Sequence, residues 1–439
     1  METFISNSVT ANTKSTLFDD NNLFPAFVAL DLLQLEVLDI SFCGILEEIV
    51  AKEDGVEEDL NFVFPKITSL QFWRLPELKR FYPGRHTLEL STLEKLKVFH
   101  CDKMTVFDSE LQTLEGPPCR EKQLEIQVHQ PLFSFIKLIA AQENNANSKG
   151  NKPPKSPTVE QLKNKAASIT KSTNDGTSHP IIIPNLLELS LSSKEATIIR
   201  QGQFPVDILR KLTVLELQCF HEESAVFPFD LLIQRVHNLE KLVVRHGLFK
   251  ELFSSGLVGE EKHAMTLARI KCLKLVWLPN LERIWNQGLL VDQLIKNLEK
   301  LEAWRCYSLT NLAPSTASFQ NLRSLDVWQC KGLIYLIASR SLVQLTAMTV
   351  RECEVITEIV ANEGDELENE IIFRKLESMR LDCLASLTSF CSANFTFKFP
   401  SLTEVIVKQC PKMETFSQRV LSAPKLQRVL WLTGEKQKG

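Results

Sequence analysis

The sequence has no uninterrupted apolar run of about 18 residues, the length that a membrane-spanning helix requires. Its N-terminus, METFISNSVTANTKSTLFDDNN, has neither a basic start followed by an apolar stretch nor a small-residue cleavage site, so we expect no secretory signal. The net charge of −4 and the isoelectric point near 6.1 do not support binding to nucleic acid or to an anionic membrane. A composition of 44% hydrophobic and 24% charged residues is typical of a soluble folded protein.

The short motifs of common catalytic and nucleotide-binding sites are also missing. There is no H-E-x-x-H, no G-x-S-x-G, no glycine-rich dinucleotide loop, no G-x-x-x-x-G-K-[ST] phosphate loop and no C-x-x-C. His100 precedes Cys101, but a histidine at a strand end explains this pair better than a Cys/His nucleophile does. We therefore predict a protein without enzymatic activity and without a cofactor.

What the sequence does contain is a nine-residue phrase that occurs three times between Leu298 and Cys353. It reads LEKLEAWRC, LRSLDVWQC and LTAMTVREC, and each copy follows L-x-x-L-x-[apolar]-x-x-C. The copies begin about 23 to 24 residues apart, which is within the range of leucine-rich repeats. Apolar residues at the fourth and sixth positions predict a short strand with one buried face. One such strand cannot bury that face alone, so we predict a stack of parallel strands.

Variants of the phrase recur along the chain. They begin at Leu35, Ile67, Leu93, Leu186, Leu212, Leu239, Ile270, Leu298, Leu322, Leu345, Leu376, Leu402 and Leu426. The array predicts an α/β fold, a leucine-rich-repeat solenoid or horseshoe. We expect a parallel β-sheet on its concave face and irregular loops and short helices on its convex face.

The cysteines are eleven, an odd number, and six of them share the ninth position of the phrase. These are Cys43, Cys101, Cys306, Cys330, Cys353 and Cys410. Such regularity predicts a buried slot for a reduced thiol, and hence an intracellular, cytoplasmic protein, because a disulfide framework is expected in short secreted chains. Neighbouring thiols would lie about 5 Å apart, but no fourth ligand is evident, so we predict no metal site.

A larger duplication lies over the small one. The segment CGILEEIVAKEDGVEEDLNFVFPKI from Cys43 matches CEVITEIVANEGDELENEIIFRKL from Cys353. In both copies a C-x-K-M-x-x-F segment follows, at Cys101 to Phe107 and at Cys410 to Phe416. The first block of repeats is therefore interpreted as a duplicate of the distal end of the main array.

Composition separates the two blocks. From about Gln142 to Pro180 the chain has almost no aromatic or branched apolar residues, and no aromatics lie between its lysines, which favours a solvated linker over an electrostatic contact arm. We expect a disordered lead at residues 1–22, a first repeat block at 23–142 and a polar flexible linker at 143–180. The main array would then occupy 181–434, with a disordered tail at 435–439.

The seventh position of the phrase faces away from the predicted core and carries candidate protein-binding residues. They are Trp73, Phe99, Trp304, Trp328, Arg351 and Lys408. Large aromatics and arginine are enriched at interface hot spots, and Trp304, Trp328 and Arg351 belong to consecutive repeats. Two interpretations stay open, namely a binding surface on the concave face, or indoles that stack on their neighbours as cover.

Several longer phrases resemble the C-terminal repeat region of plant coiled-coil, nucleotide-binding, leucine-rich-repeat disease resistance proteins. They are V-x-x-C-x-x-[LI]-x-E-I-V-A-x-E at Val350 to Glu363, L-P-x-L at Leu75 to Leu78 and Leu278 to Leu281, F-Y-P-G at Phe81 to Gly84, and C-P-K-M-x-x-F at Cys410 to Phe416. The matching blocks cover more than four fifths of the chain. The resemblance implies a sensor that holds a nucleotide-binding module inactive and recognises a pathogen effector or a guarded host protein.

The chain departs from that family pattern because it has no phosphate loop and no recognisable coiled-coil or nucleotide-binding portion, so ATP switching is not carried over. A fragment, a truncated gene product and a free-standing repeat protein all stay open. We expect a protein partner, either an effector, a guarded host protein or a nucleotide-binding module, and neither nucleic acid nor membrane. The alternative function is the substrate-binding array of an F-box-type ubiquitin-ligase adaptor, whose repeats also carry cysteine at this slot.

Overall fold

The computed structural model describes residues 8–12, 21–52, 60–84, 86–105, 130–131, 185–192, 211–220, 236–253, 269–285, 295–313, 319–338, 342, 344–361, 370–392, 395–417, 419 and 421–432. The chain divides into two compact units. Met1–Glu94 and His100–Asn185 form the first, and Lys95–Phe99 and Leu186–Gly439 form the second. The predicted linker at 143–180 and the tail at 435–439 lie outside the described residues.

The first unit contains three parallel repeat strands in the order β1 (Ser8–Asn12), β3 (Val37–Ser41) and β6 (Ser69–Trp73). Strand β1 lies within residues 1–22, the predicted lead. Shorter parallel pairs are β2 (Asn22–Pro25) with β4 (Glu48–Ala51), β5 (Leu60–Val63) with β7 (His86–Glu89), and β9 (Met104–Thr105) with β10 (Gln130–Pro131). Helix α1 (Ala26–Leu30) follows Pro25, whose missing N–H costs nothing at a helix start.

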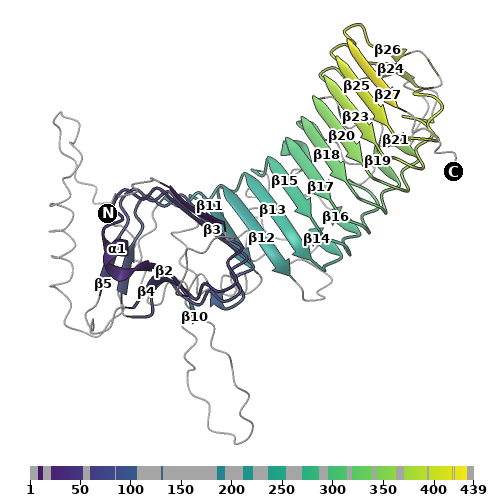
Figure 1. Ribbon diagram of the computed structural model, residues 1–439. Helices are drawn as coiled ribbons and strands as arrows, with labels where there is room; N and C mark the ends of the chain where they lie inside the picture. Colours follow the sequence, from purple (N-terminus) through teal and green to yellow (C-terminus); the bar gives the residue numbers. More distant parts are fainter. Residues whose placement is uncertain are drawn as a thin grey trace, which may run out of the picture. The chain divides into compact units, whose positions relative to one another are not determined.

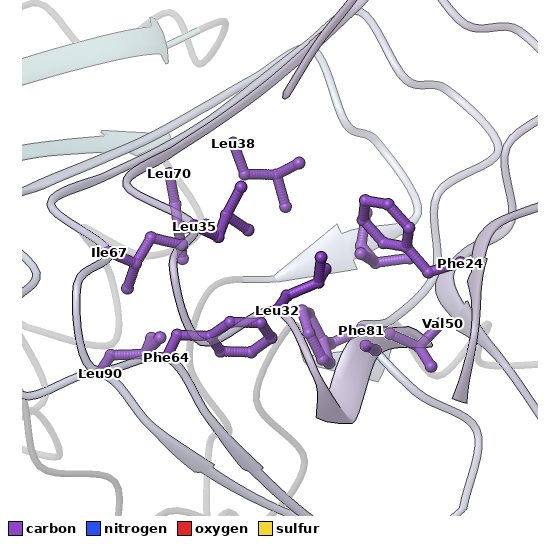
Figure 2. A pocket seen from close by; sticks show the side chains of 12 residues that line it. Phe24, Leu32, Leu35, Leu38, Val50, Phe64, Ile67, Leu70, Phe81 and Leu90 are labelled. Atoms are coloured by element: carbon purple, nitrogen blue, oxygen red, sulfur yellow. The ribbon is translucent and has the colours of Figure 1, made fainter. Parts of the chain in front are cut away.

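The core of the first unit is packed, and the space at its centre is too small for a ligand. Leu35, Leu38, Ile67 and Leu70 come from the repeat phrases, and aromatic side chains such as that of Phe24 on β2 meet them (Figure 2). The enclosed volume is about 10 Å³, no more than one water molecule would need. This region is therefore packed core.

The second unit carries a long parallel sheet whose arrows lie side by side in Figure 1. Its strands are, in order, β8 (Lys95–Phe99), β11 (Glu188–Ser192), β12 (Val214–Phe220), β13 (Lys241–Gly247), β15 (Cys272–Val276), β17 (Lys300–Trp304), β18 (Ser324–Trp328), β20 (Ala347–Arg351), β23 (Ser378–Asp382), β25 (Glu404–Lys408) and β27 (Arg428–Leu432). Each repeat strand pairs in register, position to position, with the next. The predicted solenoid and its parallel sheet are confirmed.

Burial follows the repeat phrase. In the repeat of β17, the fourth and sixth residues, Leu301 and Ala303, are fully buried, as is Cys306 at the ninth position. Leu309 and Leu312 continue the buried set at intervals of three, which turns the chain back beneath the strand. All six ninth-position cysteines are buried free thiols, as predicted.

The layer behind the sheet differs from the expectation of loops and short helices, because short parallel strands line it. In the second unit these are β14 (Glu251–Phe253) with β16 (Arg283–Trp285), β19 (Tyr335–Ala338) with β21 (Glu358–Ala361), and β22 (Glu370–Ile372) with β24 (Thr396–Lys398) and β26 (Leu421–Ser422). The E-I-V-A phrase forms β4 and β21, since β-branched residues favour extended backbone. Among the described residues, helix is confined to α1 and one turn at 295–297.

Leu325→Asp tests the register of the main array. Leu325 is 1% exposed, so the substitution loses apolar burial and places an unpaired carboxylate in the core, at a cost on the order of 4 kcal/mol. We expect a large fall in the urea midpoint, measured by circular dichroism. Ser324→Asp, one residue earlier on the outward face, should melt like the parent. Equal melts for the two variants would contradict the register.

Candidate functional site

The outward face of the sheet in the second unit brings three of the predicted residues together. Trp304, Trp328 and Arg351 end consecutive strands and pair in register. The two indoles meet edge to face, with centroids 6.3 Å apart and planes at 77°, and the guanidinium carbon of Arg351 lies 5.8 Å from the Trp328 ring. All three side chains are half-buried. They form a contiguous row, named here the Trp304 row.

The other three predicted residues lie apart from this row. Lys408 occupies the same position on β25, and Asp382 on β23 stands between it and Arg351. Phe99 ends β8, several strands away along the same sheet. Trp73 belongs to the first unit, where it is exposed and its ring centroid lies 5.7 Å from that of Phe42. Of the six candidate protein-binding residues, three therefore form one cluster and the other three lie apart from it.

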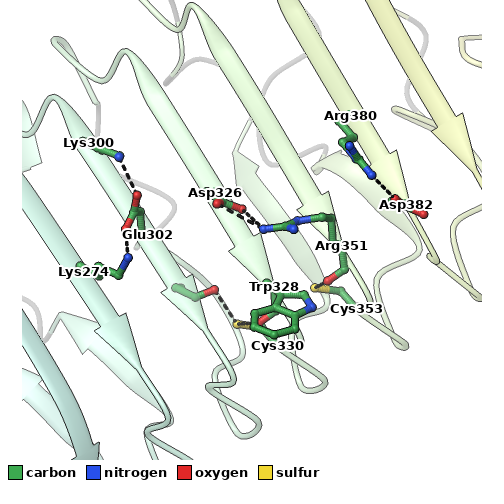
Figure 3. Close-up of polar contacts among 11 residues, drawn as sticks. Lys274, Lys300, Glu302, Asp326, Trp328, Cys330, Arg351, Cys353, Arg380 and Asp382 are labelled. Atoms are coloured by element: carbon green, nitrogen blue, oxygen red, sulfur yellow. Dashed lines mark hydrogen bonds and ion pairs between the residues drawn. The ribbon is translucent and has the colours of Figure 1, made fainter. Parts of the chain in front are cut away.

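Ion pairs across neighbouring strands fix the surroundings of the Trp304 row (Figure 3). Glu302 on β17 accepts from Lys274 on β15 at 2.7 Å and from Lys300 at 2.6 Å. The Lys274 ammonium also lies 3.5 Å from the Trp304 ring centroid. Arg351 pairs with Asp326 at 3.2 Å. The indoles are thus held between charged groups, and little side-chain freedom remains to be lost on binding.

The Glu302 carboxylate is ionised despite its position. Its side chain is nearly buried, and burial alone would raise its pKa, but hydrogen bonds from Lys274 and Lys300 outweigh that effect and lower the pKa of Glu302. The hydrogen bond between Glu302 and Lys300 in turn raises the pKa of Lys300. Glu302 and Lys300 therefore both stay charged through the neutral range.

A second row, at the eighth position of the phrase, was not predicted. Each described non-glycine residue with positive φ, between 50° and 59°, occupies this position: Phe42, Arg74, His100, His246, Trp277, Arg305, Gln329, Glu352, Cys383 and Gln409. The backbone N–H of Arg305 donates to the Trp328 carbonyl at 2.7 Å, and that of Trp277 to the Trp304 carbonyl at 2.9 Å. The ladder between repeats thus continues through a left-handed residue that costs roughly 1 kcal/mol or more.

Aromatic and cationic side chains meet along this eighth-position row. The Arg305 guanidinium carbon lies 4.9 Å from the Trp277 ring and 4.7 Å from the Trp328 ring, and His246 lies 5.9 Å from Trp277 on its other side. Trp277 is 41% exposed. The aromatic residues were visible in the repeat alignment, but the positive φ that turns them outward leaves no mark in side-chain periodicity.

The described residues offer little for catalysis or metal binding. No group of three or more His, Cys, Asp or Glu among them could hold a metal ion. A hydrogen bond with Cys306, together with burial, raises the pKa of the Cys330 thiol, and burial raises that of Cys353, so these thiols stay protonated and are poor nucleophiles. Within the same residues, no helix is both long enough and apolar enough to cross a membrane.

An open trough of about 790 Å³ runs along the starts of the strands in the second unit. Its polar side chains pair with one another: Arg269 donates to Asn238 at 2.7 Å, and Lys271 pairs with Glu240 at 3.2 Å. These four groups satisfy one another, so they do not define a ligand site.

Parallel strands stacked in register, a buried cysteine slot and an outward row of aromatic and charged residues define a leucine-rich-repeat solenoid, a fold that serves protein interaction and is generally non-catalytic. The family model described as plant disease resistance protein RPS2-like, leucine-rich repeats, matches residues 185–318 and 313–428. The matches span 185–428, which is 428 − 185 + 1 = 244 of 439 residues and more than half of the chain. The chain belongs to this family. No curated protein matches it.

Glu302→Gln tests the charged triad. We expect a loss of about 1–2 kcal/mol at pH 7, because two lysines lose their carboxylate. Since folding lowers the pKa of Glu302, its contribution is complete above the unfolded value near 4.5 and disappears as pH falls through the folded value. In urea titrations from pH 7 to pH 3, the gap between parent and variant should therefore narrow on the acid side.

The matched control is Glu240→Gln, which removes an exposed pair with Lys271 and should change the unfolding free energy by less than about 0.5 kcal/mol. A gap for Glu302→Gln that stays constant with pH would show that the triad does not stabilise the fold through its charge.

Proposed function

We propose that this chain is the effector-sensing or autoinhibitory repeat region of a plant intracellular immune receptor and acts in the cytoplasm. In this function it is a non-catalytic surface that binds protein, either a pathogen effector, a guarded host protein or the nucleotide-binding module of a receptor. Membership of the RPS2-like repeat family supports the proposal. The fold adds support, because stacked repeats present one extended face to a partner.

The observation that carries the proposal is the Trp304 row. Trp304 is held by Lys274, and Trp328 is held by Arg305 and Arg351. A pure covering role would leave the row satisfied, yet the Trp304 indole Nε1 is buried with no hydrogen-bond partner among the residues that the structure describes. A buried unpaired donor costs about 1–3 kcal/mol.

Pre-ordered aromatics beside arginine are the residue types that dominate interface energetics. Because cross-strand pairs already fix these side chains, binding orders few new rotamers. We propose that Trp73, Phe99, Trp304, Trp328, Arg351 and Lys408 all belong to protein-binding surfaces, with the Trp304 row as the energetic centre in the second unit.

The double variant Trp304→Ala with Trp328→Ala tests the proposal. Both side chains project outward from the sheet, so folding should survive. Loss of two hot-spot aromatics should weaken partner binding by at least about 2 kcal/mol, roughly 30-fold. The measurement is retention of proteins from pathogen-challenged leaf extract on immobilised parent and variant, followed by titration of each retained protein.

Val355→Ala is the control, since Val355 is 48% exposed and lies outside the repeat strands. It should retain the same proteins as the parent. The proposal is wrong if the double tryptophan variant, shown to be folded by its melt, also retains them at unchanged affinity.

A further inference from the structure

We propose that paired aromatic and arginine residues at the eighth position bind an Asp or Glu carboxylate of the protein partner, together with an apolar side chain next to it. The inference rests on the proposed function and specifies the chemistry of the partner. It is carried by two structurally separate examples, one in each unit. Each combines an exposed aromatic ring with an arginine that has no carboxylate partner among the described residues.

The example in the second unit is Arg305. Its guanidinium is stacked between the rings of Trp277 and Trp328, at 4.9 Å and 4.7 Å. Its Nε donates to the Gln329 side-chain oxygen at 2.9 Å, and Gln329 donates in turn to Glu352 at 2.6 Å. The group is therefore fixed in plane by a hydrogen bond at Nε, while its two terminal nitrogens have no hydrogen-bond partner in the described part of the chain.

The first unit repeats one part of this arrangement, the contact between an arginine and the aromatic ring of the preceding eighth-position residue. Phe42 is the eighth residue of one repeat, and Trp73 and Arg74 are the seventh and eighth residues of the next. The Arg74 guanidinium carbon lies 5.3 Å from the Phe42 ring, and Phe42 is 47% exposed. The order of residue types matches Trp277, Trp304 and Arg305. An aromatic residue at the eighth position, followed one repeat later by Trp-Arg, thus places an arginine over that aromatic ring twice.

Other arginines on the repeat strands of the second unit differ, because each has a carboxylate. Arg245 pairs with Glu216, Arg351 with Asp326, Arg380 with Asp382 and Arg428 with Glu404. No such ion pair is formed by Arg74 or Arg305 with any carboxylate that the structure describes. Within the described part of the chain these two cations lack a carboxylate, which a partner would supply.

The stacking selects the kind of partner. An aromatic face removes water from the guanidinium plane but leaves its edge free, and that edge presents two parallel donors that match a carboxylate. The neighbouring exposed ring of Trp277 or Phe42 needs an apolar side chain to cover it. A segment with Asp or Glu beside Leu, Ile, Val or an aromatic residue meets both requirements.

The experiment is selection of random dodecapeptides displayed on phage against the full chain, in parallel with the double variant Arg74→Gln with Arg305→Gln. Peptides selected on the parent should be enriched in Asp or Glu next to an apolar residue. The double variant should lose that enrichment. A synthetic peptide of the selected sequence should bind it at least about tenfold more weakly, because a charge-assisted bidentate contact is lost.

Matched variants separate a binding role from a structural one. Arg380→Gln removes an arginine that already has a carboxylate, Asp382, and should keep the enrichment. Arg305→Lys in the Arg74→Gln background keeps the charge but not the planar fork, and should weaken peptide binding at unchanged thermal stability. A loss of binding that parallels a loss of stability would overturn the inference.

The outcomes also distinguish the inference from the proposed function. Selection of peptides without acidic residues, still bound by the arginine double variant but not by Trp304→Ala with Trp328→Ala, would overturn the inference and leave the proposed function standing. No selection at all would count against both. The selected peptide should also be synthesised with Asn or phosphoserine in place of its acid. Tighter binding of the phosphoserine form would overturn the choice of carboxylate.

Discussion

Parallel hydrogen bonding in register between successive repeats is the constraint on which the rest of the second unit depends. Because each strand pairs with the next position for position, residues with the same place in the phrase must lie in one row. The rows at the fourth, sixth and ninth positions become the core, and those at the fifth, seventh and eighth become the surface. A core of aliphatic residues and thiols follows from this arrangement. On the surface, each side chain lies beside the side chain that has the same phrase position in the next repeat.

This geometry explains how charged and aromatic side chains lie side by side on the sheet without leaving a charge unpaired. Glu302 lies where two neighbouring lysines reach it, and one of these, Lys274, also contacts the Trp304 ring. The indole therefore rests on a cation whose charge is balanced by a carboxylate. A tryptophan held in this way presents a fixed shape to a partner, which distinguishes it from a flexible apolar patch.

Much of this could be predicted from the sequence, because the repeat period and the alternation within each phrase are local properties. They gave the solenoid, the parallel sheet, the buried thiol slot and the contact between Trp304, Trp328 and Arg351. The ion pair between Glu302 and Lys274 could not be read in this way, since Lys274 comes from the neighbouring repeat. The left-handed backbone at the eighth position was missed because periodicity reports which side a residue faces and not its φ angle. The strand pairs behind the sheet were missed because repeats of unequal length obscure their register.

At the eighth position the residue type can vary without affecting the core that stabilises the fold. Its conformational cost is set by the backbone, and its side chain touches other eighth-position or seventh-position side chains instead of the aliphatic core. Phenylalanine, arginine, histidine, tryptophan, glutamine, glutamate and cysteine all occupy it in this one chain. Leu301 and Leu325 are buried in the core, so we expect a replacement at the eighth position to leave their packing unchanged. The residues of this row can therefore change one at a time under selection while the core of the solenoid stays intact.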